Sequence, residues 1–221
     1  NVKNPENPLS GNNNFEKAMY HAMDRETIAR DIYGYMEPTG TYINGMAGAL
    51  SESGLCYRDS EYGKEVWDMI ESWSAEGEVC GYNPELAKQL LAEAGWDGSY
   101  TIQAVYYTAN LLDTITAIQG YWQMVGVNME FQLLTDNLTA LLWTPSPDGV
   151  TSAVDWDIAF AGTNALTLGE FYNRHHSTAA NNSTVKWNDE LDALIETAKV
   201  AVTAEQQKAA YDAIQQYENA D

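Results

Sequence analysis

The chain has 221 residues, of which 45% are hydrophobic, enough to bury one good core or two small ones. Its formal net charge of −21 opposes any general attraction to nucleic acids or to anionic membrane surfaces. Only 19% of the residues are charged and no apolar run is long enough to cross a bilayer, so neither an acidic disordered chain nor a membrane protein is indicated.

The ends of the chain suggest a segment of a longer protein. The sequence begins at Asn1 without Met or a secretory signal, and it stops at Asp221 inside helical composition. We therefore expect that half of any shared binding site lies in a missing part.

The first predicted elements are two helices that follow a polar segment. Residues 1–14, rich in Asn and Pro, are predicted to be a linker or an entering segment. Asn14 is expected to cap a helix that starts at Phe15, and Asp24 a second helix that runs to about Tyr33, because both side chains can accept free N–H groups of a first turn. The apolar positions of the first helix are Ala18, Met19, Ala22 and Met23.

A glycine-rich irregular loop over 37–58 leads to a predicted helix over 60–77. This helix lies between the only two cysteines, Cys56 and Cys80. Their separation suits a disulfide in an exported protein, and the alternative is a pair of buried free thiols. A zinc site is disfavoured because no CxxC pair or nearby His accompanies them.

The stretch from Tyr82 to Leu133 alternates helical and strand patterns. Asn83 can accept the first free N–H groups of a helix, and Pro84 suits the first helical turn. Gly95 can adopt the left-handed conformation that ends this helix.

A strand is predicted over 101–107, followed by a helix that Gly126 ends and by a second strand over 127–133. The apolar stripe of this helix consists of Leu111, Ile115, Ile118, Tyr121, Trp122 and Val125. In the second strand Val127, Met129, Phe131 and Leu133 alternate with polar residues, as in a strand buried on one face. Two strands joined by a crossing helix predict a parallel βαβ unit and an α/β fold.

The remaining elements, in order, are a short helix over 136–143, a strand over 156–162 in the same sheet, and a helix over 168–176. Asn188 then favours the start of a helix, and Thr203 with Gln206 forms a capping box for the last one. The positions expected to face inward in these two helices are Leu191, Leu194, Ile195, Ala198 and Val202, and Ala209, Ala210, Ala213, Ile214 and Tyr217.

Residues that could carry catalysis do not form a known constellation. The sequence has no GxSxG, HExxH, P-loop or GxGxxG motif. His175 and His176 are adjacent and point in different directions, so we interpret them as surface or loop residues rather than as metal ligands. His21 is interpreted as an interior histidine of the first helix. A hydrolase is therefore the weakest of the functional hypotheses.

Candidate ligand-facing residues lie where the predicted strands end. Tyr106 and Tyr107 close the strand over 101–107, and one of them is expected to be interior and the other at the rim. In open α/β sheets, ligands bind beyond the carboxyl ends of the strands. The loops over 107–110 and 162–168 leave such ends, so we expect them to face a ligand.

Four strings carry a resemblance to a known family: FEKAMYHAMDRETI at 15–28, GYNPELAKQLLAEAGW at 81–96, WDIAFAG at 156–162, and NDELDALIETAKV at 188–200 with the helix after it. They resemble the second lobe of the family 5 solute-binding proteins of the peptide and nickel class, which serve ABC importers. The match extends in order over helix, turn, strand, helix and strand and is therefore specific. Many members have only a short loop at 56–80, so this segment is interpreted as a helical insertion.

The resemblance implies an α/β fold, namely one lobe of a type II periplasmic-binding-protein-like architecture with a mixed, mostly parallel sheet flanked by helices. Residues 1–221 would form this single lobe. It implies a binding module and not an enzyme, with no cofactor and no metal, in which two lobes close over a ligand by hinge motion. The residues that would line one wall of the cleft are Tyr107, Asn110, Thr163, Asn164 and Leu166.

The implied partners are a peptide or related small solute, the missing first lobe and ABC permease subunits. The protein would be a monomer outside the cytoplasm, either periplasmic or anchored at the cell surface as a lipoprotein, and it would not bind nucleic acid. The alternative is the ligand-sensing domain of a transcription regulator, which an upstream helix-turn-helix would favour and a Cys56–Cys80 disulfide would disfavour.

Leu166 departs from the pattern of the peptide-binding members. In those proteins an acidic residue of this loop meets the free ammonium group of the ligand, whereas an apolar side chain cannot compensate the desolvation of that charge. A standard site for free peptides is therefore not expected from this loop, and no residue supports the binding of a nickel chelate.

Overall fold

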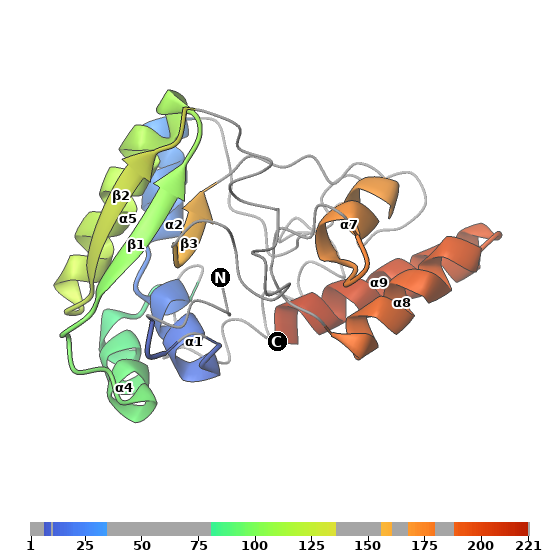
Figure 1. Cartoon of the computed structure of the whole chain (residues 1–221), viewed down its shortest axis with the longest axis horizontal. Coiled ribbons are helices and arrows are strands. Elements are labelled where there is room, and N and C mark those ends of the chain that lie inside the picture. Colours follow the sequence, from blue (N-terminus) through green and yellow to red (C-terminus); the bar gives the residue numbers. More distant parts are fainter. Residues whose placement is uncertain are drawn as a thin grey trace. The chain divides into compact units, whose positions relative to one another are not determined.

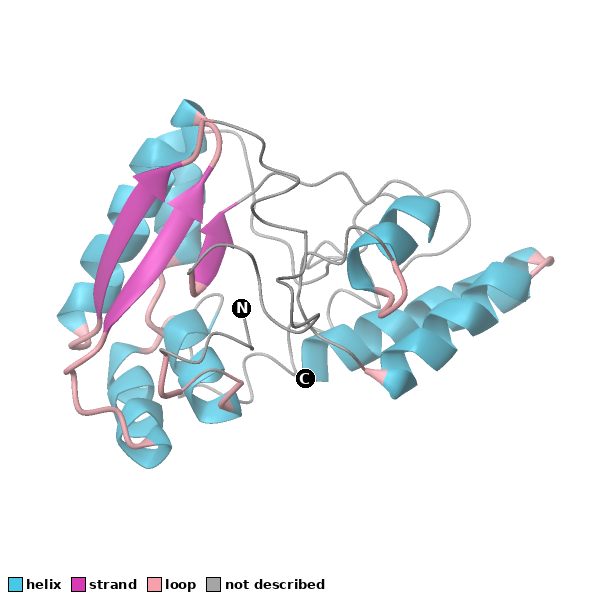
Figure 2. Cartoon of the chain, viewed as in Figure 1, coloured by secondary structure: helices cyan, strands magenta, loops and turns pink. Residues whose placement is uncertain are grey.

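The computed structural model describes residues 7–9, 11–34, 81–135, 156–160, 168–179 and 188–220 (Figure 1). The chain divides into two compact units, one formed by residues 1–38 and 71–162 and the other by residues 39–70 and 163–221. The first unit contains the described sheet, and the described part of the second is helical (Figure 2).

The sheet of the first unit has three parallel strands in the order β2-β1-β3. The central strand is β1, Thr101–Tyr106, which pairs with β2, Asn128–Leu133, on one side and with β3, Ile158–Phe160, on the other. The predicted parallel βαβ unit and the third strand in the same sheet are thereby confirmed.

Two helices of the βαβ region begin and end where their terminal residues predict. In α4, Pro84–Ala94, the Leu86 N–H donates to Asn83 Oδ1 over 2.9 Å, and Gly95 follows with a φ of 83°. The crossing helix is α5, Leu112–Met124, reached from β1 through the 3₁₀ turn Ala109–Leu111. Figure 1 shows α5 and α2 on one face of the sheet.

The N-terminal helices are α1, Asn13–His21, and α2, Arg25–Ile28. The cap of α1 is Asn12, not Asn14 as predicted, because Asn12 Oδ1 accepts from the N–H groups of Asn14 and Phe15. Three consecutive Asn residues offer the same chemistry, so composition alone does not select among them. Asp24 caps α2 as predicted, accepting from Thr27 N–H over 2.9 Å.

The core of the first unit joins α1, α4, α5 and the sheet, with Trp122 of α5 donating from Nε1 to the Met19 carbonyl over 3.1 Å. The alternation predicted for β2 fails at its end, since Leu133 is 38% exposed and Leu134 is buried. The reason is that Leu133 is the last residue paired with β1, and the Leu134 N–H turns in to the Tyr106 carbonyl at 2.7 Å.

The second unit contains α7, Leu168–His175, α8, Asp189–Val200, and α9, Ala204–Ala220. The buried residues of its core are Phe171, Leu191, Ile195, Ala198, Ala210, Tyr211 and Ile214. Asn188 caps α8, and the capping box of Thr203 and Gln206 is formed as predicted.

Two of the residues predicted to face inward in this unit are exposed instead. Val202 is 83% exposed because α8 ends at Val200 and leaves Val202 in the turn. Ala209 is exposed and Tyr211 is buried instead, since the inward face of α9 is set by Ala210, Tyr211 and Ile214.

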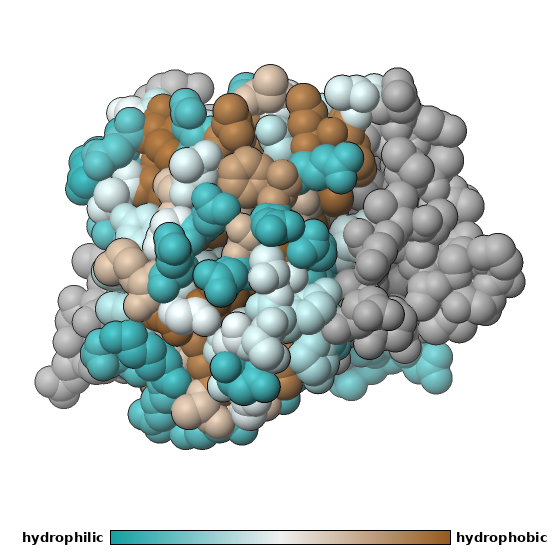
Figure 3. Space-filling view, turned by 60° about the vertical axis from the view of Figure 1, so that its left-hand side comes forward, coloured by the Kyte–Doolittle hydropathy of each residue, from teal (hydrophilic) through white to brown (hydrophobic). Residues whose placement is uncertain are grey.

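On the face drawn in Figure 3, hydrophobic residues are interspersed with hydrophilic ones. Among the described residues the large hydrophobic side chains that are exposed are Leu112, Met124, Leu133, Val200 and Val202. In this part of the chain no helix has the length and apolar character that a bilayer crossing needs.

Candidate functional site

The carboxyl end of β1 presents one tyrosine inward and one at the rim, as predicted. Tyr106 is buried, with its ring centroid 6.0 Å from that of Phe131 in an edge-on contact. Tyr107 is half-buried. The edge that ligands use in open α/β sheets therefore carries Tyr107 at the end of β1. The residue before it, Tyr106, packs against Phe131 in the interior.

The loop after Tyr107 is polar and internally bonded. The Thr108 hydroxyl donates to Asn110 Oδ1 over 2.5 Å, and Asn110 is exposed. Leu111, the residue at the cap position of α5, provides no side-chain hydrogen bond to the first turn. The loop thus offers an exposed amide side chain, a group that hydrogen-bonds polar parts of a solute.

A second element reaches this edge. The hydroxyl oxygen of Tyr33 lies 2.7 Å from that of Thr114, in the first turn of α5, and the two residues are 81 positions apart in the chain. No pattern in the sequence indicates this contact, because it joins two helical segments through the ends of their side chains.

The other predicted ligand-facing residues, Thr163, Asn164 and Leu166, lie outside the described residues. The same holds for Cys56 and Cys80, for the insertion 56–80 and for the short helix predicted over 136–143. Their roles stay predictions.

Away from the carboxyl edge, a buried carboxylate ties β3 to β1. Asp157 precedes β3, is 3% exposed, and accepts from Gln103 N–H over 2.7 Å and from the Tyr100 hydroxyl over 3.1 Å. Its own N–H donates to the Gln103 carbonyl. Through these bonds Asp157 holds β3 to β1.

His175 and His176 are buried, which corrects the prediction of surface positions, and His176 lies in the turn after α7, as a loop residue would. His175 stacks on Phe171 with ring centroids 4.2 Å apart, and His176 stacks on Tyr172 at 4.4 Å. Burial, with a smaller contribution from nearby Arg174, lowers the pKa of His175 to about 4. Each His follows an aromatic residue at i+4, the spacing of neighbours on a helix, so both rings find a partner although they are adjacent.

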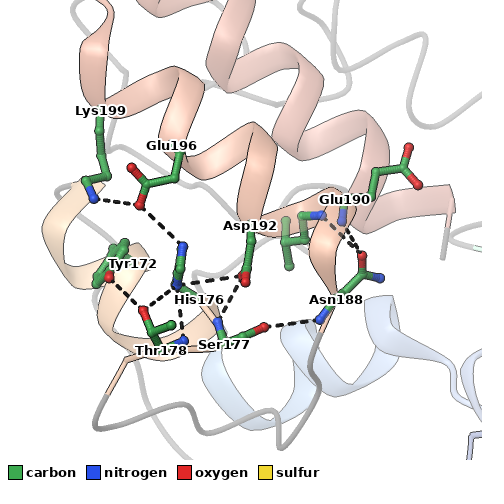
Figure 4. Close-up of polar contacts among 10 residues, drawn as sticks. Tyr172, His176, Ser177, Thr178, Asn188, Glu190, Asp192, Glu196 and Lys199 are labelled. Carbon is green, nitrogen blue, oxygen red and sulfur yellow. Dashed lines mark hydrogen bonds and ion pairs between the residues drawn. The ribbon is translucent and has the colours of Figure 1, made fainter.

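His176 lies at the centre of a polar cluster between α7 and α8 (Figure 4). Its Nδ1 is 3.1 Å from Thr178 N, and because that backbone N–H can only donate, Nδ1 accepts and the ring proton resides on Nε2. Nε2 lies 3.3 Å from Glu196 Oε1, and Glu196 in turn accepts from Lys199 over 2.6 Å.

The same cluster fixes the turn that follows α7. The Ser177 N–H donates to Asp192 Oδ1 over 2.9 Å, and the Ser177 hydroxyl accepts from Asn188 N–H over 3.2 Å (Figure 4). Ser177 therefore faces a backbone amide and not the imidazole, so the pair is not arranged as nucleophile and base. Across the described segments, no three His, Cys, Asp or Glu side chains converge in a way that could hold a metal ion.

His21 is an interior histidine, as predicted. It is fully buried, and its Nδ1 is hydrogen-bonded to the Gly81 carbonyl. Burial lowers its pKa, and the bond to Gly81 opposes this effect. Gly81 has a φ of 69°, and a Cβ there would lie 3.1 Å from the Tyr20 ring, so the backbone approach to α1 depends on glycine.

Known proteins match the sequence over much of its length. The family model for bacterial extracellular solute-binding proteins, family 5 Middle, matches residues 2–183. Putative ABC transporter peptide-binding proteins of Brucella ovis and Brucella abortus are 29% identical over 131 residues, which are 57% of this chain and 20% of theirs.

Solved structures share the fold at low sequence identity. The ABC transporter substrate-binding protein CtaP of Listeria monocytogenes superposes with a TM-score of 0.68 at 20% identity, over 96% of this chain and 39% of that one. The oligopeptide-binding protein AppA of Bacillus subtilis, in complex with a nonapeptide, gives 0.67 at 19% identity, over 98% and 41%. NikA of Staphylococcus aureus, in complex with Ni(L-His)2, gives 0.63 at 19% identity, over 93% and 39%.

The chain thus spans about two fifths of the length of these solved proteins and a fifth of that of the Brucella relatives. At these identities the superpositions establish the fold alone, an α/β periplasmic-binding-protein architecture of type II. With the family model matched over most of its residues, the chain belongs to the bacterial extracellular solute-binding proteins of family 5.

Proposed function

We propose that this chain is a ligand-binding lobe of an extracellular solute-binding protein that delivers peptides or a related small solute to an ABC importer, and that it is not an enzyme. The observation that carries the proposal is the carboxyl edge of the parallel sheet, where half-buried Tyr107 and exposed Asn110 leave the end of β1. Membership of family 5 and the names of the Brucella relatives support it.

In this proposal Tyr107 and Asn110 contribute to one wall of a cleft, and Thr163, Asn164 and Leu166 are further candidates for ligand contact. The facing wall belongs to a first lobe, and the two lobes close over the solute by hinge motion before the closed form docks on the permease. The protein acts as a monomer outside the cytoplasm, in the periplasm or anchored to the cell surface. The Brucella relatives and CtaP are named as binding proteins of ABC transporters, and no observation favours the regulator alternative.

The expected ligand contacts follow from the side chains at the edge. A tyrosine ring supplies a large, rigid apolar surface with a hydroxyl at its end, and an asparagine amide can both donate to and accept from a peptide bond. Affinity from this lobe alone is weak, because most of the ligand surface stays in water until a second lobe covers it.

The experiment is an NMR titration of the 221-residue chain with tetra-alanine at millimolar concentration. We expect the amide signals of Tyr107 and Asn110 to shift on titration, and the shifts to weaken in Asn110→Ala. Asn128→Ala is the matched control, because Asn128 is also an exposed asparagine but starts β2 at the opposite end of the sheet. Peptide-induced shifts confined to residues away from the edge, or unchanged by Asn110→Ala, would overturn the proposal.

A further inference from the structure

The helix that begins at Arg25 changes its winding before it ends. After α2 the residues Ala29–Tyr33 form a single π turn, in which the Gly34 N–H donates to the Ala29 carbonyl, five residues back, over 3.0 Å. Gly34 ends the turn with a φ of 70°. The sequence predicted an ordinary helix here. Single π turns are rare and occur frequently at functional sites, so this departure calls for a reason.

The last residue of the π turn makes the contact with α5. Tyr33 is half-buried, and its hydroxyl is 2.7 Å from the hydroxyl of Thr114. Thr114 is four residues beyond Asn110, and the residue at the cap position between them, Leu111, supplies no side-chain hydrogen bond. The N–H groups of Leu111 and Leu112 are bonded within the 3₁₀ turn, and Thr114 lies in the helical turn that follows it. Helix ends open more readily than helix interiors, so a contact at Thr114 stabilises the end of α5 that adjoins the loop.

Two contacts near the loop from Tyr107 to Leu111 differ in whether they can fix the position of that loop. The hydrogen bond from Thr108 to Asn110 lies within the loop and moves with it. The contact of Tyr33 with Thr114 reaches a separate element, whose own start is held by Asp24 through Thr27. Only a contact of the second kind can set the position of the loop relative to the rest of the unit.

We infer that Tyr33 is a positioning residue of the proposed ligand wall. The π turn delivers the Tyr33 hydroxyl to Thr114, and this contact holds the first turn of α5, and with it the loop from Tyr107 to Leu111, in the geometry that binds a solute. The effect on binding rests on the proposed function, whereas the effect on α5 does not.

The first measurement is amide hydrogen exchange of the 221-residue chain without peptide. Tyr33→Phe keeps the ring and removes the hydroxyl. We expect the amides of residues 115–118, whose helical acceptors are the carbonyls of the first turn, to exchange about fivefold faster, the factor that the loss of one neutral hydrogen bond typically gives. Amides in β2 are expected to keep their rates.

Tyr100→Phe is the matched control, since it also removes a tyrosine hydroxyl, bonded to Asp157 at the other end of β1. It should leave the exchange of residues 115–118 unchanged. If it accelerates these amides as much as Tyr33→Phe does, or if neither variant changes them, Tyr33 does not position α5.

A double-mutant cycle with Thr114→Val identifies the contact. If the two hydroxyls act on each other, Thr114→Val should accelerate the same amides, and Tyr33→Phe should add little to it. Fully additive effects would contradict the inference.

Tetra-alanine titrations separate this inference from the proposed function. We expect Tyr33→Phe to weaken peptide binding severalfold. The melting temperature of the first unit should not change, because a residue that acts only on the position of the loop does not alter the stability of the sheet. Equal peptide affinity in the original chain and in Tyr33→Phe, despite faster exchange, would overturn the role in binding. If neither the original chain nor Tyr33→Phe binds the peptide at the carboxyl edge of the sheet, the proposed function is overturned. Faster exchange of residues 115–118 in Tyr33→Phe would then still support the role of Tyr33 in positioning α5.

Discussion

Burial of His175 makes the second unit sensitive to acid. The pKa of His175 is about 4 in the folded protein, below the ordinary value of 6.5, because the charged imidazolium is poorly solvated beside Phe171. Between these two values the unfolded chain binds a proton that the folded chain does not. The stabilisation is therefore complete above about pH 6.5 and is lost as the pH falls toward 4.

We expect about 3 kcal/mol of stability to be lost between pH 6.5 and pH 4, because the folded protein takes up this proton only near its pKa of about 4. Urea unfolding followed through α7 and α8 signals at pH 7 and pH 4.5 measures it. His175→Phe keeps a ring on Phe171 and removes the titration, so it should flatten the pH dependence. An equally steep dependence in His175→Phe would assign the effect to other groups.

Asp157 is expected to be the most sensitive polar residue of the sheet. Asp157→Asn removes the charge that Gln103 N–H and the Tyr100 hydroxyl face, and should lower the free energy of unfolding by about 1.5–3 kcal/mol. Glu130→Gln removes the same charge from an exposed position of β2 and should change it by less than about 0.5 kcal/mol. Urea denaturation measures the free energy of unfolding of both variants. Equal losses would mean that the change in net charge, rather than the loss of the buried contacts, causes the destabilisation.

Single residues were predicted well where local chemistry decides and poorly where a tertiary partner does. Tyr106 and Tyr107 were placed correctly, because alternation along a strand is a local rule. His175 and His176 were predicted to be surface or loop residues rather than metal ligands because they are adjacent, yet both are buried and each packs on its own aromatic neighbour four residues earlier. That spacing was present in the sequence. The partners of Asp157 lie in another strand and left no local pattern.

At the scale of elements, the capping box of α9 should be measurable by itself. The Thr203 hydroxyl accepts from Gln206 N–H over 3.1 Å, so Thr203→Ala should destabilise the second unit by about 1 kcal/mol. Thr197→Ala removes another exposed hydroxyl, one that bonds the Ala193 carbonyl inside α8, and is expected to be neutral because alanine is the better helix former. Thermal unfolding ranks the two variants, and a greater loss in Thr197→Ala would contradict this account.

Helix and strand identities followed from periodicity, and most boundaries from capping chemistry. Asn83, Gly95, Asp24 and Asn188 all act where predicted. The first cap was displaced to Asn12 because identical residues compete there. The π turn after α2 was missed because the helical periodicity of the sequence did not distinguish it from an ordinary helical turn.

At the scale of the whole molecule, we predict that the ligand class depends on Leu166. This position was predicted from the family pattern, in which peptide binders carry an acid there, and it lies outside the described residues. Leu166→Asp should favour a peptide with a free amino terminus over its acetylated form by about tenfold, the factor that a charged hydrogen bond supplies. Calorimetry with the matched peptide pair measures the preference. Tight binding of free peptides that is insensitive to Leu166→Asp would show that the position was assigned wrongly.

The order of strands in the sheet has a kinetic consequence. β1 meets β2 across a single helix, whereas Asp157, which leads β3 to β1, bonds a residue 54 positions away. Closing a longer loop costs more chain entropy, so β3 is expected to join after the βαβ unit has formed. Asp157→Asn should then speed unfolding and leave the refolding rate almost unchanged in a stopped-flow urea series. Strand β3 would therefore be the last part of the described sheet to assemble and the first to detach.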